Sequence, residues 1–68
     1  MHLDQVRQAL KELNGERDAR FVFEGGAEAL TVRKAFLVPE EPDRIVKLTD
    51  GQKVFMLDAA RVVWVEIG

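Results

Sequence analysis

The stretch that decides the fold reads "AEALTVRKAFLV", residues 27–38. Apolar residues recur along it with the two-residue period of a strand that has one buried face. Lys34 interrupts that face, and a run of about twelve residues is longer than most strands. The pattern predicts one long strand with a β-bulge or sharp bend near Arg33–Lys34, which re-aims the lysine. The side chains expected to share the buried face are Leu30, Val32, Phe36 and Val38.

Four further strands are expected around this one, each bounded by residues that favour turns. Gly25-Gly26 and Asp50-Gly51 predict tight hairpins. The segment "PEEPD" at 39–43 predicts an exposed loop, and "DAA" at 58–60 predicts a single 3₁₀ turn started by Asp58. The five strands are expected at about 20–24, 27–38, 44–49, 52–57 and 61–67.

The amino-terminal segment predicts one helix at about 3–14. Its apolar residues recur at spacings of three and four, which forms one stripe on a helix. Asn14-Gly15 supplies a left-handed stop at its end. The stripe consists of Leu3, Val6, Leu10 and Leu13.

Together these elements predict a single domain, 1–68, that is mainly β with one amino-terminal α-helix. The preferred architecture is a five-stranded antiparallel, strongly bent sheet that forms a small, partly open barrel. In the order and spacing of its elements the chain resembles SH3-like and Sm-like barrels. The Sm family's second motif, a Gly followed by a hydrophobic-Arg-Gly triplet, is missing from "DAARVVWVEI", so the resemblance implies no RNA-binding residues here. The alternative is an α+β open antiparallel sheet with the helix packed on one face.

Composition excludes several classes of protein. The 68 residues include no cysteine, so disulfides and thiolate zinc sites are excluded. The formal net charge of −2 attracts no polyanion overall. No run approaches the roughly 20 apolar residues of a transmembrane helix, and no signal-peptide core precedes the helix. We therefore expect a soluble cytoplasmic protein that does not associate with membranes.

Few residues offer catalytic chemistry. The chain has no Ser, Cys or Tyr, and Thr31 and Thr49 both lie in predicted strands. His2, the single histidine, is expected to be an incidental surface residue beside the initiator methionine. The acidic group of residues 40–43 lacks the spacing of a calcium loop and is expected to be solvated. The sequence predicts no catalytic, cofactor-binding or metal site, and hence no enzyme.

The carboxy-terminal strands carry more apolar surface than one helix can cover. "RVVWVEIG", residues 61–68, is apolar on both sides, and so is "KVFML" at 53–57. Exposed apolar areas of that size mark interaction sites. We therefore expect a non-catalytic interaction or assembly module that forms a homo-oligomer and that also has a candidate surface for a protein partner. A two-fold dimer is the first expectation and a ring joined by strand pairing at sheet edges the second. The candidate interface residues are Leu3, Val6, Leu10, Leu13, Val63, Trp64, Val65 and Ile67.

Nucleic-acid binding is the alternative function. Small barrels bind single strands through basic grooves combined with exposed aromatic side chains. Acidic residues alternate with the basic ones along this chain, and lysines at sheet edges also protect against aggregation. The candidate basic residues, on the second to fourth predicted strands, are Arg33, Lys34, Arg44, Lys47 and Lys53.

Overall fold

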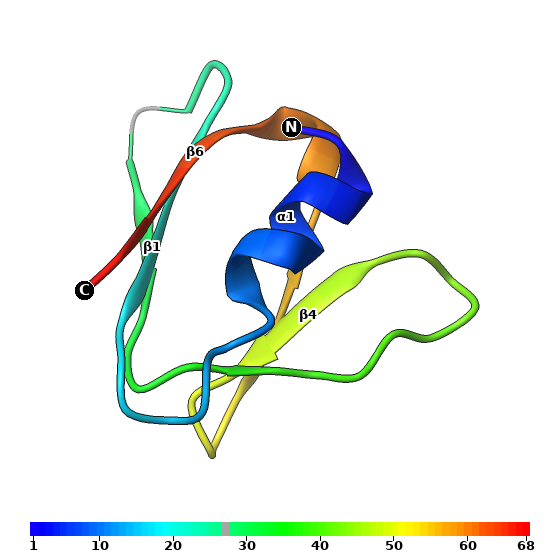
Figure 1. Cartoon of the computed structure of the whole chain (residues 1–68). Coiled ribbons are helices and arrows are strands. Elements are labelled where there is room, and N and C mark those ends of the chain that lie inside the picture. Colours follow the sequence, from blue (N-terminus) through cyan, green and yellow to red (C-terminus); the bar gives the residue numbers. More distant parts are fainter. Residues whose placement is uncertain (27) are drawn as a thin grey trace.

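The computed structural model describes residues 1–26 and 28–68, so the predicted start of a strand at Ala27 lies outside the described residues. One short helix precedes six strands, and a 3₁₀ turn joins the last two strands (Figure 1). The elements are α1 (Leu3–Leu10), β1 (Ala19–Phe23), β2 (Leu30–Val32), β3 (Phe36–Leu37), β4 (Val46–Thr49), β5 (Val54–Leu57), η1 (Ala59–Arg61) and β6 (Val62–Ile67).

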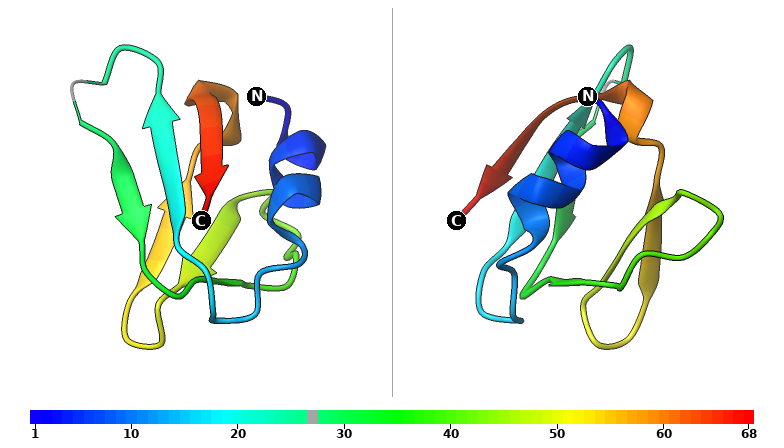
Figure 2. Two further views of the ribbon diagram at one scale, coloured as in Figure 1. Left: turned by 60° about the vertical axis from the view of Figure 1, so that its left-hand side comes forward. Right: turned by 45° about the vertical axis from the view of Figure 1, so that its right-hand side comes forward.

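The strands form two three-stranded antiparallel sheets rather than one sheet. The first has the order β2-β1-β6 and the second the order β3-β4-β5. The single five-stranded bent sheet predicted from the sequence is therefore not found in residues 1–26 and 28–68, and neither is the single open sheet. No hydrogen-bonded ladder closes these described strands into a barrel. Figure 2 shows β6 and β5 diverging from η1, with α1 lying over the opening between the two sheets.

The predicted long strand is broken where a bend was expected. Lys34 has a φ of +47°, in the left-handed region, and it separates β2 from β3. The backbone N–H of Lys34 donates to Asp18 Oδ1 at 3.0 Å, and the next N–H, of Ala35, donates to the carbonyl of Arg17 at 2.9 Å. The segment before β1 therefore holds the bend by two adjacent hydrogen bonds.

The bend also reverses which residues face the core. Val32 and Ala35 are both fully buried, whereas Phe36 is exposed. In a regular strand, core-facing residues lie two positions apart, but Val32 and Ala35 lie three positions apart. The bend therefore contains one extra residue. The expectation that Phe36 shares the buried face with Val32 is therefore wrong.

A second irregularity occurs where β6 pairs with β1. Val22 pairs with Trp64, but Phe23 pairs with Val62, so Val63 is an extra residue in β6. Strict alternation would place Val62 and Trp64 on one side. The bulge instead places Val62 in the core and leaves Trp64 exposed.

The helix is stabilised by an amino-terminal cap and by burial of its stripe. The N–H of Asp4 donates to His2 Nδ1 at 3.2 Å, and the N–H of His2 donates to Gln5 Oε1 at 3.0 Å. These bonds satisfy two amides that a helix start leaves unpaired. Val6 and Leu10 are fully buried against the strands. The helix ends at Leu10, four residues earlier than the predicted end at 14. Within the described residues, no helix has the length and apolar character needed to cross a membrane.

The segment after the helix is fixed by contact between a glycine and an aromatic ring. Gly15 has a φ of +87°, and its N–H donates to the carbonyl of Ala35 at 3.0 Å. A β-carbon at Gly15 would lie within 2.9 Å of three atoms of the Phe36 ring. The ring therefore packs directly on the glycine backbone, on the side of β3 that faces away from the core.

This contact predicts that Gly15→Ala destabilises the fold more than an alanine at another left-handed glycine. The left-handed conformation costs an alanine about 1–2 kcal/mol, and crowding against a ring adds about 1–3 kcal/mol. Gly51→Ala is the matched control, because Gly51 has a φ of +95° and a β-carbon there would have no atom within 4 Å. Chemical denaturation measures both losses. Equal losses would contradict a tight contact between Gly15 and Phe36.

Candidate functional site

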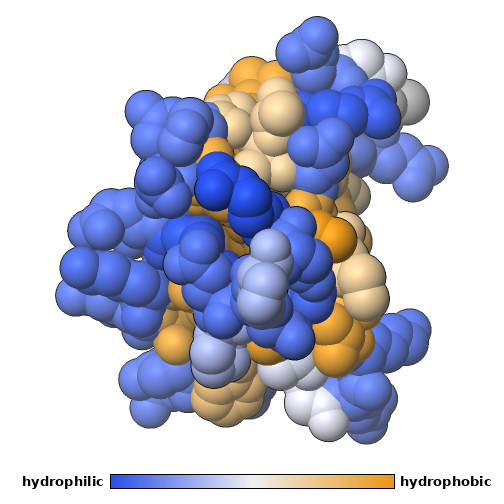
Figure 3. Space-filling model, turned by 90° about the vertical axis from the view of Figure 1, so that its right-hand side faces the viewer, coloured by the Kyte–Doolittle hydropathy of each residue, from blue (hydrophilic) through white to orange (hydrophobic). Residues whose placement is uncertain are grey.

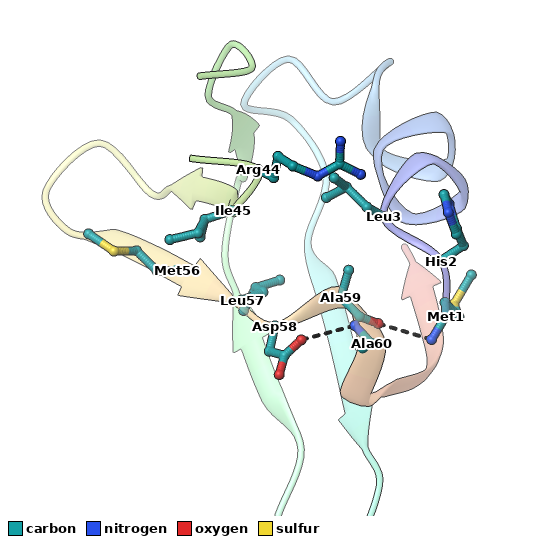
Figure 4. A pocket seen from close by; sticks show the side chains of 10 residues that line it. All are labelled: Met1, His2, Leu3, Arg44, Ile45, Met56, Leu57, Asp58, Ala59 and Ala60. Atoms are coloured by element: carbon teal, nitrogen blue, oxygen red, sulfur yellow. Dashed lines mark hydrogen bonds between the residues drawn. The ribbon is translucent and has the colours of Figure 1, made fainter. Parts of the chain in front are cut away.

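A groove of about 500 Å³ opens at the end of the molecule where η1 joins β5 to β6. Ile45 and Met56 lie on one side of it, and Met1, His2 and Leu3 on the other (Figure 4). The 3₁₀ turn forms the floor. Most of this lining is apolar, and both Ile45 and Met56 are exposed. The groove therefore suits an apolar side chain of a ligand or partner.

Three polar residues border the groove, and two of them have structural roles. Asp58 Oδ1 accepts from the N–H of Ala60 at 3.1 Å and starts η1. His2 lies at the surface as expected, but it also caps α1 and is therefore not incidental. Arg44 extends its guanidinium toward Leu3 in Figure 4, and no ion pair joins it to another residue of 1–26 or 28–68. The site thus offers one cation and apolar surface, but no nucleophile.

The acidic loop is neutralised by one lysine. Lys47 Nζ lies 2.6 Å from Glu41 Oε1 and 2.6 Å from Asp43 Oδ2, and its side chain is only 13% exposed. The hydrogen bond from Lys47 lowers the pKa of Asp43 below its usual value, and the bond to Asp43 raises the pKa of Lys47 above 10.5. The loop is therefore held against β4, and its carboxylates are already occupied.

The helix holds the start of the same loop. Arg7 Nη2 donates to the carbonyl of Val38 at 3.3 Å, and Arg7 Nε lies 3.8 Å from Glu40 Oε1. In the described part of the chain, no three histidine, aspartate or glutamate side chains gather closely enough to hold a metal ion. The pairing of these carboxylates with Lys47 and Arg7 explains the acidic segment as a structural feature.

The hydroxyl of Thr49 and the carboxylate of Asp50 shape the β4–β5 hairpin. Thr49 donates to the carbonyl of Lys53 at 2.7 Å. Asp50 Oδ1 accepts from the N–H groups of Lys53 at 2.8 Å and Gln52 at 2.9 Å, and these bonds lower the pKa of Asp50. Both side chains are thus committed to the turn.

The basic candidates do not form one free patch. Arg33 and Lys34 lie at the bend between β2 and β3, Lys53 lies in the β4–β5 hairpin, and Arg44 lies at the groove. Lys47 is paired with two carboxylates. Lys47 is therefore not available to a shared basic patch, whereas the pairing of Phe36 with Thr49 places the bend beside the β4–β5 hairpin.

The candidate interface residues divide by burial. Val6 and Leu10 are fully buried in the chain's own core, so they have no surface left for a partner. Leu3, Leu13 and Val65 are half-buried against that core. The remaining three candidates, all exposed, are Val63, Trp64 and Ile67.

Four more exposed apolar side chains lie outside the set of candidates. The two-sided pattern of "KVFML" points to two of them. Figure 3 shows apolar surface in separate patches between charged side chains on the face that it presents. The complete set, 37–67% exposed, is Phe36, Ile45, Val54, Met56, Val63, Trp64 and Ile67.

No protein-family model, curated protein or solved structure matches the chain.

The ion pairs of Lys47 predict how stability depends on pH. The lowered pKa of Asp43 stabilises the fold above the normal carboxyl range, and this contribution is lost as pH falls through the folded-state value. The raised pKa of Lys47 stabilises the fold below pH 10.5, and this contribution is lost as pH rises above that value. The substitution Lys47→Met removes both stabilising contributions. We expect the variant to unfold more easily than wild type near neutral pH, with the difference shrinking at both extremes.

Denaturation curves recorded across the pH range measure that difference. Lys11→Met is the control, because Lys11 is exposed and forms no ion pair with another described residue. Its difference from wild type is expected to stay small and constant. A difference for Lys47→Met that does not change with pH would contradict the assignment.

Proposed function

We propose that this protein is a small, non-catalytic assembly module that associates with copies of itself through apolar surface on its strands. We also propose that the two sheets are the halves of a partly open barrel. The finding that carries the assembly proposal is the exposure of seven large apolar side chains in a chain of 68 residues.

The position of these side chains supports self-association more than scattered surface exposure does. Val54 and Met56 lie on β5, and Val63, Trp64 and Ile67 lie on β6. Each of these strands pairs with only one neighbour among the described strands. Exposed apolar side chains on strands with a free edge are a liability that monomers usually remove with charge or proline. Their presence favours an edge that is covered in use.

Size is a second argument for assembly. A chain of about 60 residues buries only roughly 60% of the surface that its unfolded form exposes. Small domains compensate with disulfides, metals or oligomerisation, and a cysteine-free sequence has no disulfides. Association adds buried apolar area at about 25 cal/mol per Å², which stabilises the fold as the assembly forms.

The proposal predicts a molar mass above 7.7 kDa that increases with protein concentration. Size-exclusion chromatography with light scattering measures this mass. The double variant Val54→Thr, Met56→Gln removes apolar surface from β5 without adding charge, and it should weaken assembly at least tenfold. Ala29→Gln is the control, because it changes an exposed apolar residue just before β2. A wild-type monomer at every concentration would refute self-association.

Nucleic-acid binding is the weaker candidate. The bend presents Arg33 and Lys34 next to each other, and both are exposed. Against this, Lys47 is neutralised and the net charge is −2. We expect no binding to single-stranded RNA or DNA even at low salt, where phosphate contacts are strongest. Fluorescence anisotropy measures this, and binding that Arg33→Glu with Lys34→Glu abolishes would instead favour the nucleic-acid function.

A further inference from the structure

We infer that the contact between copies is head to tail: the free edge of β5 in one copy pairs, antiparallel, with the free edge of β6 in the next. This inference rests on the proposed self-association and names its surface. It follows from the direction in which the backbone groups of each edge point.

On β5, the edge-facing residues are the ones with exposed side chains. The N–H of Asp50 donates to the carbonyl of Lys53 at 3.4 Å, so these two residues form a bonded pair at the end of the hairpin. Bonded and non-bonded pairs alternate along an antiparallel ladder. Val54 and Met56 are therefore non-bonded with β4, and their backbone groups point to the free edge. Their side chains lie on the outer face, away from the core.

On β6, the edge-facing residues have side chains on the opposite face. Asp18 and Gly68 exchange two backbone hydrogen bonds of 3.0 Å and form a bonded pair. Alternation then leaves Val65 and Ile67 with backbone groups that point away from β1. Val65 packs against the core, and Ile67 lies at its exposed margin. No hydrogen bond among residues 1–26 and 28–68 uses the edge-facing backbone groups of these two residues.

The edge-facing residues have side chains on the outer face in β5 and on the core face in β6, and this difference determines how the two edges can pair. Residues directly opposite each other in an antiparallel pair have side chains on the same face. Joining β5 to β6 of a neighbour therefore places Val54 and Met56 beside the neighbour's Val65 and Ile67. The outer side of one sheet then continues as the core side of the next. The apolar side chains that one copy exposes extend the open core of another.

The same rule argues against closure within one chain. Closing the barrel would require the backbone groups of the core-facing residues on both strands either all to point at the shared edge or all to point away from it. On β6 these groups point at the free edge, but on β5 those of the core-facing Phe55 and Leu57 point to β4. Pairing of β5 with β5 would leave Val65 and Ile67 uncovered. Head-to-tail pairing covers the free edges of β5 and β6. Because these two surfaces differ, it builds a ring or an open chain of copies.

Two single-edge variants test this contact. Met56→Lys places a charge on the β5 edge and Ile67→Lys places one on the β6 edge, which blocks strand pairing. Each variant alone is expected to run at the mass of one chain, 7.7 kDa. Mixed one to one, they should form a complex of twice that mass, because each supplies the edge that the other lacks. Ala29→Lys is the control and should assemble like wild type.

A one-to-one mixture that stays at 7.7 kDa while wild type assembles overturns head-to-tail pairing. If wild type assembles and one of the variants alone also assembles fully, the contact between copies uses one edge twice or neither edge. Head-to-tail pairing is then overturned, and self-association stands. If wild type is a monomer at every concentration, both proposals fail. Circular dichroism checks that each variant is folded. Val54→Lys with Ile67→Glu supplies a second pair at exposed positions if the first pair misfolds.

Discussion

The bend at Lys34 is the constraint on which the rest of this structure depends. A continuous strand from β2 to β3 would belong to one sheet and keep one set of residues on the core side. One extra residue, taken up by the left-handed Lys34, divides the strand between two sheets and turns Phe36 outward. The bend is held from outside by Asp18 and the Arg17 carbonyl. The segment between α1 and β1 therefore determines where the two sheets separate.

The separation has a consequence at the other end of the molecule. Two sheets joined at β2 and β3 are open where β5 and β6 diverge, and η1 alone connects them there. The helix covers part of this opening, with Val6 and Leu10 completely buried. Because its stripe is used within the chain, α1 cannot also cover the outer face of β5. The lysine and arginine that hold residues 38–43 likewise serve the chain itself.

Much of the fold could be predicted from the sequence, because periodicity and turn residues are local properties. The helix start, the Asp50-Gly51 hairpin, the turn at Asp58 and the bend near Lys34 all follow from a few neighbouring residues. The division into two sheets could not be predicted. A bulge or bend can be expected from a lysine on an apolar face, but whether it adds a residue to the alternation depends on hydrogen bonds to a distant segment. The same holds for Val63, because a bulge in β6 is defined only against its partner β1.

The candidate surface could likewise be predicted only where it depends on neighbouring residues, and not where it depends on pairing with a distant strand. Apolar excess on the last two strands is visible in the sequence, but strict alternation through Val63 assigns Val62 and Trp64 to one face, and only the bulge separates them. The sequence shows that Val54 and Met56 belong to a strand that is apolar on both faces. It does not show that this strand lies at the edge of a sheet, because strand order is not encoded in a local pattern. Once the order is known, their backbone direction follows from one hairpin hydrogen bond. The apolar side chains and the free backbone groups then lie on the same residues. A partner that satisfies the hydrogen bonds of this edge must therefore also cover Val54 and Met56, and the core-side edge of β6 in a second copy offers matching apolar surface.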